Sequence, residues 1–203
     1  VAFVKDTIPG DIIDAQVIKK KKGIQEAVPV KYHRRSDDFV PAFCDHFDDC
    51  GGCKLQNLTY EKQLFYKQKM VLDAFQRIAK VPVESFIDIL GSQRTTRYRN
   101  KLDFAFSCSR WITKNEAAND TAIENANALG FHVAGRFDKI LHVDECHLQP
   151  EPVNAIRNLT YEFCLEHNLS FYDIKAHVGI MRALIVRDNG EGEFMVTIML
   201  GED

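Results

Sequence analysis

Hydrophobic and polar residues repeat with two different periods along the chain, and these periods separate predicted helices from predicted strands. Apolar residues recur at helical spacing over residues 60–79 and again over residues 152–167. Pro82 is expected to end the first helix, and Pro152 suits the first turn of the second. Alternating or short apolar runs predict five strands. These strands span residues 101–106, 129–133, 139–143, 181–186 and 194–200.

Two other segments predict a hairpin and a loop. Residues 12–18 and 24–30 have the pattern of strands on either side of a basic turn at residues 19–23, which predicts a hairpin. Residues 115–127 are polar, acidic and rich in Ala and Asn. This composition predicts a mobile hairpin loop, with a short helix as the alternative. The elements together predict an α+β fold in which two helices flank a mixed, mainly antiparallel sheet.

The composition is that of a globular protein. With 203 residues, 45% of them hydrophobic, the chain can bury one sizeable core and a smaller second one. It has no apolar run approaching the roughly 18 residues that span a bilayer, and no charged and then apolar leader. We therefore expect a soluble, cytoplasmic protein with no membrane partner, and the sequence indicates no protein partner. Because Val1 opens a predicted strand without a start methionine, we also expect a piece of a longer protein.

The net charge of −3 conceals an asymmetry between the two ends of the chain. Residues 1–36 contain eight Lys and Arg against four Asp and Glu, so they carry +4 and the remaining residues carry −7. Four consecutive lysines occupy the predicted hairpin turn, namely Lys19, Lys20, Lys21 and Lys22. Lysines at such a turn can contact a phosphate backbone, or they can simply keep a solvated turn soluble.

Four cysteines carry the strongest chemical signal. Three lie in the run Cys-Asp-His-Phe-Asp-Asp-Cys-Gly-Gly-Cys and the fourth lies far downstream; they are Cys44, Cys50, Cys53 and Cys146. Three clustered thiolates with one remote thiolate are typical of a cubane 4Fe–4S cluster, whereas structural zinc usually takes two compact ligand pairs. Gly51 and Gly52 would let backbone amides approach the sulfurs. A 4Fe–4S cluster is therefore the first hypothesis, zinc the second and buried free thiols the third.

A second run combines cations with an aromatic residue. Between residues 94 and 101 there are four cations, one tyrosine and no acidic residue: Arg94, Arg97, Tyr98, Arg99 and Lys101. Arg and Lys can pair with phosphates while Tyr98 offers a face for base stacking, which is the combination used on single-stranded nucleic acid. The alternative is an ordinary charged entry into a strand.

Several of these motifs resemble those of one enzyme family, the iron–sulfur-containing RNA (uracil-5-)-methyltransferases. The resemblance covers nearly the whole chain but only the front half of the family's length. It rests on Phe-Cys-x5-Cys-Gly-Gly-Cys-Lys-Leu-Gln at residues 43–56, Tyr-Glu-Lys-Gln at 60–63, Tyr-Lys-Gln at 66–68, Tyr-Arg-Asn-Lys at 98–101, Leu-Gly-Phe-His at 129–132 and Val-Asp-Glu-Cys at 143–146.

The resemblance implies an organisation for the chain. Residues 1–40 would be a partial TRAM domain, an incomplete OB-like β-barrel, and residues 41–203 a cluster-bearing central domain. The S-adenosylmethionine-dependent catalytic domain, whose cysteine attacks C6 of uracil before the C5 atom is methylated, would lie beyond residue 203. The parent enzyme would act on RNA, and the barrel remnant favours 23S ribosomal RNA over transfer RNA. No catalytic residue is expected in this chain, and the chain alone should be inactive.

Two other classes of protein fit the residues without a methyltransferase parent. One is a zinc- or iron–sulfur-stabilised RNA-binding module. The other is an iron–sulfur electron carrier, although such carriers usually show a compact run of four cysteines, which the remote Cys146 argues against.

Overall fold

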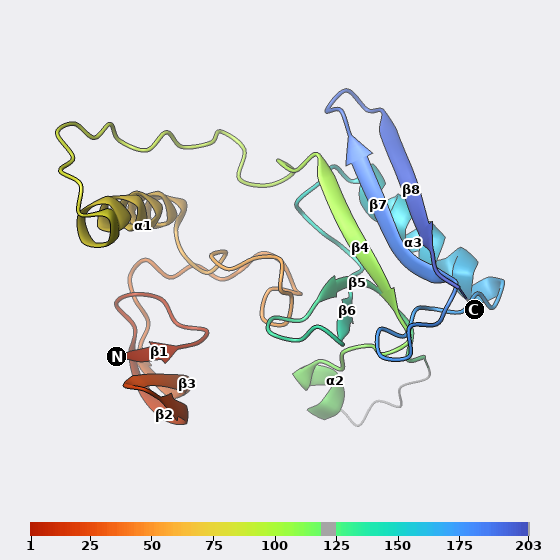
Figure 1. Ribbon diagram of the computed structural model, residues 1–203, viewed down its shortest axis with the longest axis horizontal. Helices are drawn as coiled ribbons and strands as arrows, with labels where there is room; N and C mark the ends of the chain where they lie inside the picture. The colour runs from red at the N-terminus through yellow and green to blue at the C-terminus, as the bar shows by residue number, and fades with distance from the viewer. Residues whose placement is uncertain (119–124, 203) are drawn as a thin grey trace. The chain divides into compact units, whose positions relative to one another are not determined.

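The computed structural model describes residues 1–118 and 125–202 (Figure 1). The chain forms two compact units that interleave along the sequence. The first unit consists of Val1–Phe43 and Lys54–Ser92, and the second of Cys44–Cys53 and Gln93–Asp203. The sequence predicted a single boundary at residue 40, between residues 1–40 and 41–203. The two units do not follow one boundary along the chain, so these domain limits stay a prediction.

The first unit contains an open sheet of three strands. Strand β1 (Ala2–Val4) runs parallel to β3 (Ile24–Arg34), and β3 pairs on its other side with the antiparallel strand β2 (Ile12–Lys21). The turn between β2 and β3 places Lys22 at φ +46° and Gly23 at φ +82°, the two left-handed residues of a type I′ hairpin turn. The predicted hairpin is thus confirmed. The described residues of this unit do not close into a barrel, and an OB-like barrel stays a prediction.

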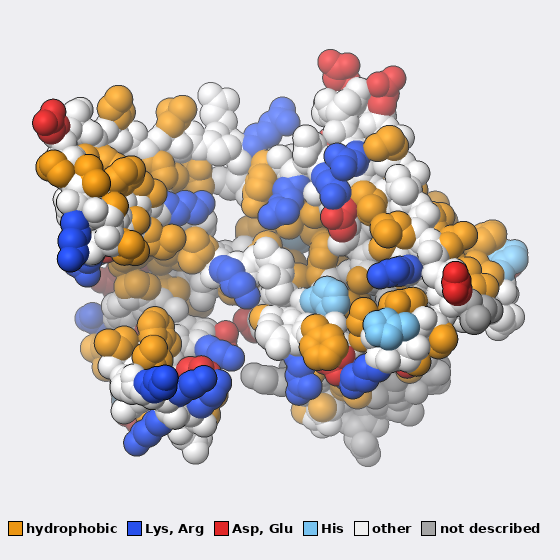
Figure 2. All heavy atoms as spheres, viewed as in Figure 1, with side chains coloured by type: hydrophobic (Ala, Val, Ile, Leu, Met, Phe, Trp, Pro, Cys, Tyr) orange, Lys and Arg blue, Asp and Glu red, His pale blue; other side chains and the backbone are white. Residues whose placement is uncertain are grey.

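The helix predicted over residues 60–79 is also confirmed and belongs to the first unit. It begins as α1 (Tyr60–Asp73), continues as the π-helical segment η1 (Ala74–Ala79), and ends at Lys80, whose φ is +54°. All of α1 is described, and none of its side chains is buried. Several large apolar side chains of this helix are exposed: Phe65, Met70, Val71, Phe75 and Ile78. Figure 2 shows hydrophobic side chains gathered over α1.

The second unit is built on an antiparallel sheet of five strands. In spatial order these are β6 (Ile140–His142), β5 (Ala128–His132), β4 (Lys101–Ser107), β7 (Met181–Asp188) and β8 (Phe194–Leu200). All five strands predicted from the sequence are therefore present. Strand β8 lies at one edge, and six of its seven residues are exposed.

One helix packs on this sheet and completes the core of the second unit. Helix α3 (Pro152–Glu166; Figure 1) begins with Pro152 in its first turn, as predicted. It buries Val153 and Cys164 in the core that the strands form. Phe104 and Leu184 lie fully buried at the centre. The sequence predicted two helices flanking one sheet. Of the helices described in this unit, only α3 flanks the sheet, because α1 belongs to the first unit.

A short helix, α2 (Lys114–Ala118), begins the segment for which a mobile loop was predicted. Thr113 and Glu116 form a capping box, because the backbone N–H of Thr113 donates to Glu116 Oε2 at 2.9 Å and that of Glu116 donates to Thr113 Oγ1 at 3.3 Å. Arg110 forms an ion pair with Glu116. The alternative of a short helix therefore holds for residues 114–118, and residues 119–124 lie outside the described part of the chain.

Among the helices that the structure describes, none has both the length and the apolar character needed to cross a membrane.

Candidate functional site

Cys44, Cys50 and Cys53 lie in a loop of the second unit that the backbone fastens to the sheet. The N–H of Cys50 donates to the carbonyl of His46 at 2.8 Å, which closes a turn inside the loop. Cys50 forms an isolated antiparallel bridge with Val133, and the Gly51 N–H donates to the carbonyl of His132 at 3.0 Å. The end of β5 therefore sets the position of this loop, which we call the cysteine loop (residues 44–53).

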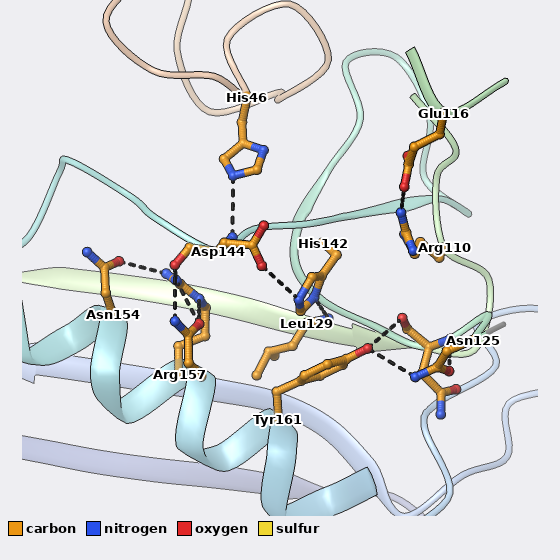
Figure 3. Close-up of polar contacts among 12 residues, drawn as sticks. His46, Arg110, Glu116, Asn125, Leu129, His142, Asp144, Asn154, Arg157 and Tyr161 are labelled. Carbon is orange, nitrogen blue, oxygen red and sulfur yellow. Dashed lines mark hydrogen bonds and ion pairs between the residues drawn. The ribbon is translucent and has the colours of Figure 1, made fainter. Parts of the chain in front are cut away.

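Two side-chain contacts hold the cysteine loop from other directions. The indole Nε1 of Trp111 donates to Asp49 Oδ1 at 2.9 Å. The backbone N–H of Asp144 donates to His46 Nε2 at 3.3 Å, as Figure 3 shows. The second contact links the loop to the segment that carries Cys146, although the two are far apart in the sequence.

Helix α3 holds the segment around Cys146. The backbone N–H of Cys146 donates to Asn154 Oδ1 at 2.9 Å, and Asn154 Nδ2 donates back to the Cys146 carbonyl at 3.4 Å. Arg157 Nη1 donates to the same Asn154 oxygen at 2.9 Å, and Arg157 Nη2 donates to the carbonyl of Asp144 (Figure 3). Two side chains of one helix therefore fix the backbone from Asp144 to Cys146.

The Cys50 sulfur accepts a hydrogen bond from the backbone N–H of Gly52, whose nitrogen lies 3.4 Å away. The backbone N–H groups of His46 and Leu148 also lower the pKa of the Cys44 and Cys146 thiols, respectively. Such N–H donors stabilise thiolate, the form of cysteine that ligates metals, and hydrogen bonds to sulfur tune the potential of iron–sulfur clusters.

The four thiols lie near enough to one another to interact electrostatically, and this holds for every pair among them. Burial, and then the charges of Cys53, Cys146 and Cys44, raise the pKa of the Cys50 thiol to about 11. Burial also raises the pKa of Cys44 and that of Cys146. Among the described residues, no three or more His, Cys, Asp and Glu side chains form a group that could hold a metal ion. The cysteines thus share one region without closing around a single ion.

The basic run from Arg94 to Lys101 lies beside the segment that follows Cys146. The N–H of Arg97 donates to the His147 carbonyl at 2.7 Å, and the N–H of Arg99 donates to that of Leu148 at 2.8 Å. Arg97 adopts a left-handed φ of +52° there. Arg94, Arg97 and Arg99 are exposed, and 56% of the Tyr98 surface is open to solvent. Tyr98 therefore has the accessible ring that base stacking requires.

The remaining residues predicted to contact RNA, Lys101 and the hairpin lysines, differ in their exposure and in their ion pairs. Lys101 is half-buried at the start of β4, and its Nζ lies 2.8 Å from Asp103 Oδ2. Lys19, Lys20 and Lys21 end strand β2, so only Lys22 occupies the turn itself. All four lysines of the hairpin are exposed, and Lys19 Nζ lies 3.3 Å from Glu26 Oε1. Figure 2 shows Lys and Arg side chains gathered over the three-stranded sheet.

The sequence interpretation missed the residues that support the cysteines. Asn154 and Arg157 are polar residues three positions apart within the apolar pattern of α3, and both are buried. A buried polar pair at helical spacing was a usable signal, because such residues need partners. The contact between Trp111 and Asp49 had no comparable signal, because it joins residues distant in the sequence.

Two curated bacterial proteins are similar to this chain over nearly its whole length. An uncharacterized RNA methyltransferase of Bacteroides thetaiotaomicron is 43% identical over 199 residues, which are 98% of this chain and 44% of the relative. The chain is similar to part of an RNA methyltransferase. An uncharacterized RNA methyltransferase of Porphyromonas gingivalis is 40% identical over 208 residues, covering 100% of this chain and 45% of that protein. The chain thus spans less than half the length of these curated relatives. No family model matches it.

A solved structure extends the similarity to three dimensions. The crystal structure of the tRNA (uracil-54, C5)-methyltransferase of Pyrococcus abyssi, in complex with S-adenosyl-L-homocysteine, aligns with a TM-score of 0.68 and 27% sequence identity. The alignment covers 100% of this chain and 42% of that enzyme. The chain therefore has the fold of a part of this methyltransferase.

We expect Gly51→Ala to disturb the cysteine loop. A Cβ atom at residue 51 would lie 2.5 Å from the carbonyl oxygen of His132, the oxygen that accepts the Gly51 N–H. Because this neighbour is backbone, the loop must shift, at a cost of about 1–3 kcal/mol. Chemical denaturation would measure the loss. Gly52→Ala is the matched control, since its Cβ would meet only the Cys50 sulfur at 3.5 Å. Equal stability of the two variants would contradict the docking of this loop on β5.

Proposed function

We propose that this chain is the RNA-binding and cluster-binding part of an S-adenosylmethionine-dependent RNA (uracil-C5-)-methyltransferase. The observation that carries the proposal is the alignment of the whole chain, at a TM-score of 0.68, with a solved enzyme of that specificity. The 43% and 40% identity to two bacterial RNA methyltransferases supports the same class of reaction. In this proposal the methyl transfer itself belongs to a part of the protein other than this chain.

We propose that Cys44, Cys50, Cys53 and Cys146 hold a 4Fe–4S cluster. The donor set fits such a group, because four thiols share one region and the Cys50 sulfur already accepts a backbone N–H hydrogen bond. Each thiolate of a cubane cluster binds a different iron, so its ligands need not converge on one point. When bound, the cluster would crosslink the cysteine loop to the segment that precedes α3. With four cysteine ligands it has no open iron site, which favours a structural role.

We further propose that the hairpin lysines and the run from Arg94 to Lys101 contact RNA. Exposed cations supply attraction to phosphates, and the exposed ring of Tyr98 supplies stacking. An enzyme that modifies a base must first take it out of its stack, which costs a few kcal/mol and requires a firm hold on the RNA. This chain would provide part of that hold.

The kind of RNA is open to a direct test. The sequence argument for 23S ribosomal RNA depended on the N-terminal segment, but the solved transfer-RNA enzyme aligns with the whole chain, residues 1–40 included. This segment therefore does not separate the two substrates. Binding of this chain to 23S ribosomal RNA and to transfer RNA, compared at one salt concentration, would indicate which one the parent enzyme modifies.

We expect the chain alone to bind RNA and to methylate none of it. The test uses labelled S-adenosylmethionine and unmodified transcripts of both RNAs, with 5-methyluridine measured in nuclease digests. A chimaera in which this chain replaces the matching part of the Bacteroides thetaiotaomicron relative should form 5-methyluridine. Turnover by the chain alone would contradict the assignment of catalysis to another part of the protein. A chimaera that binds RNA but forms another methylated nucleoside would refute uracil-C5 specificity.

A further inference from the structure

Among the described residues of the second unit, Arg157 is the most deeply buried charged one, with 0% of its surface exposed. Its guanidinium packs over the ring of Phe104, with Cζ 5.3 Å from the ring centroid. Arginine stays protonated in proteins, so a full positive charge lies within this core. Burying a charge without a compensating partner is expensive, and the core of a small domain must therefore supply one.

The hydrogen bonds of Arg157 do not supply that partner. They go to the amide oxygen of Asn154, the amide oxygen of Asn158 and the backbone carbonyl of Asp144, all of which are neutral groups. Within the described residues Arg157 forms no ion pair with a carboxylate. Of the acidic groups that act on Arg157, Cys146 in its thiolate form acts most strongly, ahead of the carboxylates of Asp144, Glu151 and Glu145.

The geometry joins Arg157 to Cys146 through a single atom. Asn154 Oδ1 accepts both the Cys146 N–H and the Arg157 Nη1, each at 2.9 Å. The other guanidinium nitrogen holds the carbonyl of Asp144, two residues before Cys146 (Figure 3). The guanidinium of one arginine thus holds the backbone that presents the fourth sulfur, and its charge is near enough to interact with that sulfur.

We propose that Arg157 is the buried counter-charge of the cluster site and, together with Asn154, positions the Cys146 thiolate as its fourth ligand. This inference rests on the proposed cluster. A cubane cluster with four thiolate ligands carries net negative charge, and net charge together with hydrogen bonding to the sulfurs sets its reduction potential. A fixed cation near one sulfur would therefore stabilise the bound cluster and raise its potential.

Three variants separate the charge of Arg157 from its positioning role. Arg157→Gln removes the charge and keeps hydrogen-bonding capacity. Arg157→Lys keeps the charge but lacks the planar fork that reaches two acceptors. Asn154→Ala removes the bridging oxygen and leaves the charge in place. Arg182→Gln, on the exposed side of β7 in the same unit, removes one positive charge from the surface and is the control.

The measurements are iron per chain after anaerobic reconstitution, cluster retention against a chelator, and the reduction potential from a redox titration. We expect Arg157→Gln to weaken retention about 10- to 100-fold, as for other residues that support metal ligands. It should also shift the potential to a more negative value, because a nearby cation no longer favours the added electron. Arg157→Lys should keep the reduction potential of the parent chain but should retain the cluster as poorly as Arg157→Gln does. Asn154→Ala should lower retention and leave the potential near that of the parent, and Arg182→Gln should change neither.

The outcomes distinguish this inference from the cluster proposal on which it rests. A parent chain that binds no iron after reconstitution overturns the cluster and the role of Arg157 together. A parent chain that binds the cluster, combined with an Arg157→Gln variant of unchanged potential and retention, overturns the role of Arg157 alone. If Arg157→Gln does not fold, Arg157→Lys and Asn154→Ala still test the inference, because both should lose retention while keeping the potential of the parent chain, and parental retention in both would overturn it.

Discussion

Cys146→Ser should release the iron and lower the free energy of unfolding by about 3–5 kcal/mol. Ligation of Cys146 closes a long loop back to the cysteine loop, and long closures restrict the unfolded chain most. Serine preserves the size of the side chain and the backbone contacts with Asn154, so the loss would report the missing bond rather than a new cavity. Anaerobic denaturant unfolding and iron analysis on the same sample measure both effects.

Cys108→Ser is the control for this experiment. Cys108 is a half-buried thiol of the same unit that lies near Asp173 and is not among the four proposed ligands. This variant should keep its iron and most of its stability. If Cys146→Ser loses iron while its unfolding free energy stays unchanged, the cluster does not hold the fold together. A variant that keeps its iron would remove Cys146 from the ligand set, and zinc in place of iron would favour the second metal hypothesis.

Local patterns predicted most of the elements because the physics that forms them is local. The alternation over residues 101–106 became β4, and the helical spacing over residues 152–167 became α3. The hairpin at Lys22 and Gly23 follows from the left-handed φ that its turn requires. The short helix after Thr113 was predictable too, since Thr113 and Glu116 have the spacing of a capping box.

The parts that the sequence did not predict depend on packing between distant segments. The apolar pattern over residues 60–79 implied a buried face, yet Val71 is 47% exposed and Ile78 is 82% exposed. Periodicity gives the face of a helix but not what covers it, and an exposed apolar patch marks a binding or packing surface. The same limit applies to the cysteine loop, because its contacts with His132 and Trp111 join segments that no local pattern connects.

The four cysteines show what spacing in the sequence can and cannot predict. Their spacing suggested a common site, and the structure adds the Gly52 N–H that donates to the Cys50 sulfur and the hydrogen bond between the Cys146 backbone and Asn154 of α3. The spacing of the cysteines could not reveal Arg157, because the signal for it is the polar pair within the apolar pattern of α3. The charge of the proposed cluster supplies a reason for a cation at that buried position.

RNA binding by this chain should depend steeply on salt. The hairpin lysines and the run from Arg94 to Lys101 can neutralise about four to six phosphates. At roughly 0.7 per phosphate for single strands, the slope of log K against log salt would be about −3 to −4. Affinity should be weak at physiological salt, because the negative charge carried by the rest of the chain repels the RNA backbone. Filter binding or fluorescence anisotropy over a series of salt concentrations gives the slope directly.

Two sets of variants separate the phosphate contacts from base stacking. Replacing Lys19, Lys20, Lys21 and Lys22 with Gln should flatten the slope, because fewer counterions are released on binding. The same replacement at Lys67 and Lys80, which are exposed on and after α1, is the control for net charge and should leave the slope nearly unchanged. A quadruple variant with the slope of the parent chain would indicate that the hairpin lysines form a solvated turn and do not contact phosphates.

Tyr98→Ala tests the stacking contribution in the same assay. It should weaken binding by about 1–3 kcal/mol at every salt concentration and leave the slope unchanged, because a neutral ring releases no counterions. Tyr98→Phe keeps the ring and should bind like the parent. If Tyr98→Phe loses as much affinity as Tyr98→Ala, the hydroxyl rather than the ring contacts the RNA. Undetectable or salt-independent binding by the parent chain would leave the cluster unit as a scaffold without an RNA contact of its own.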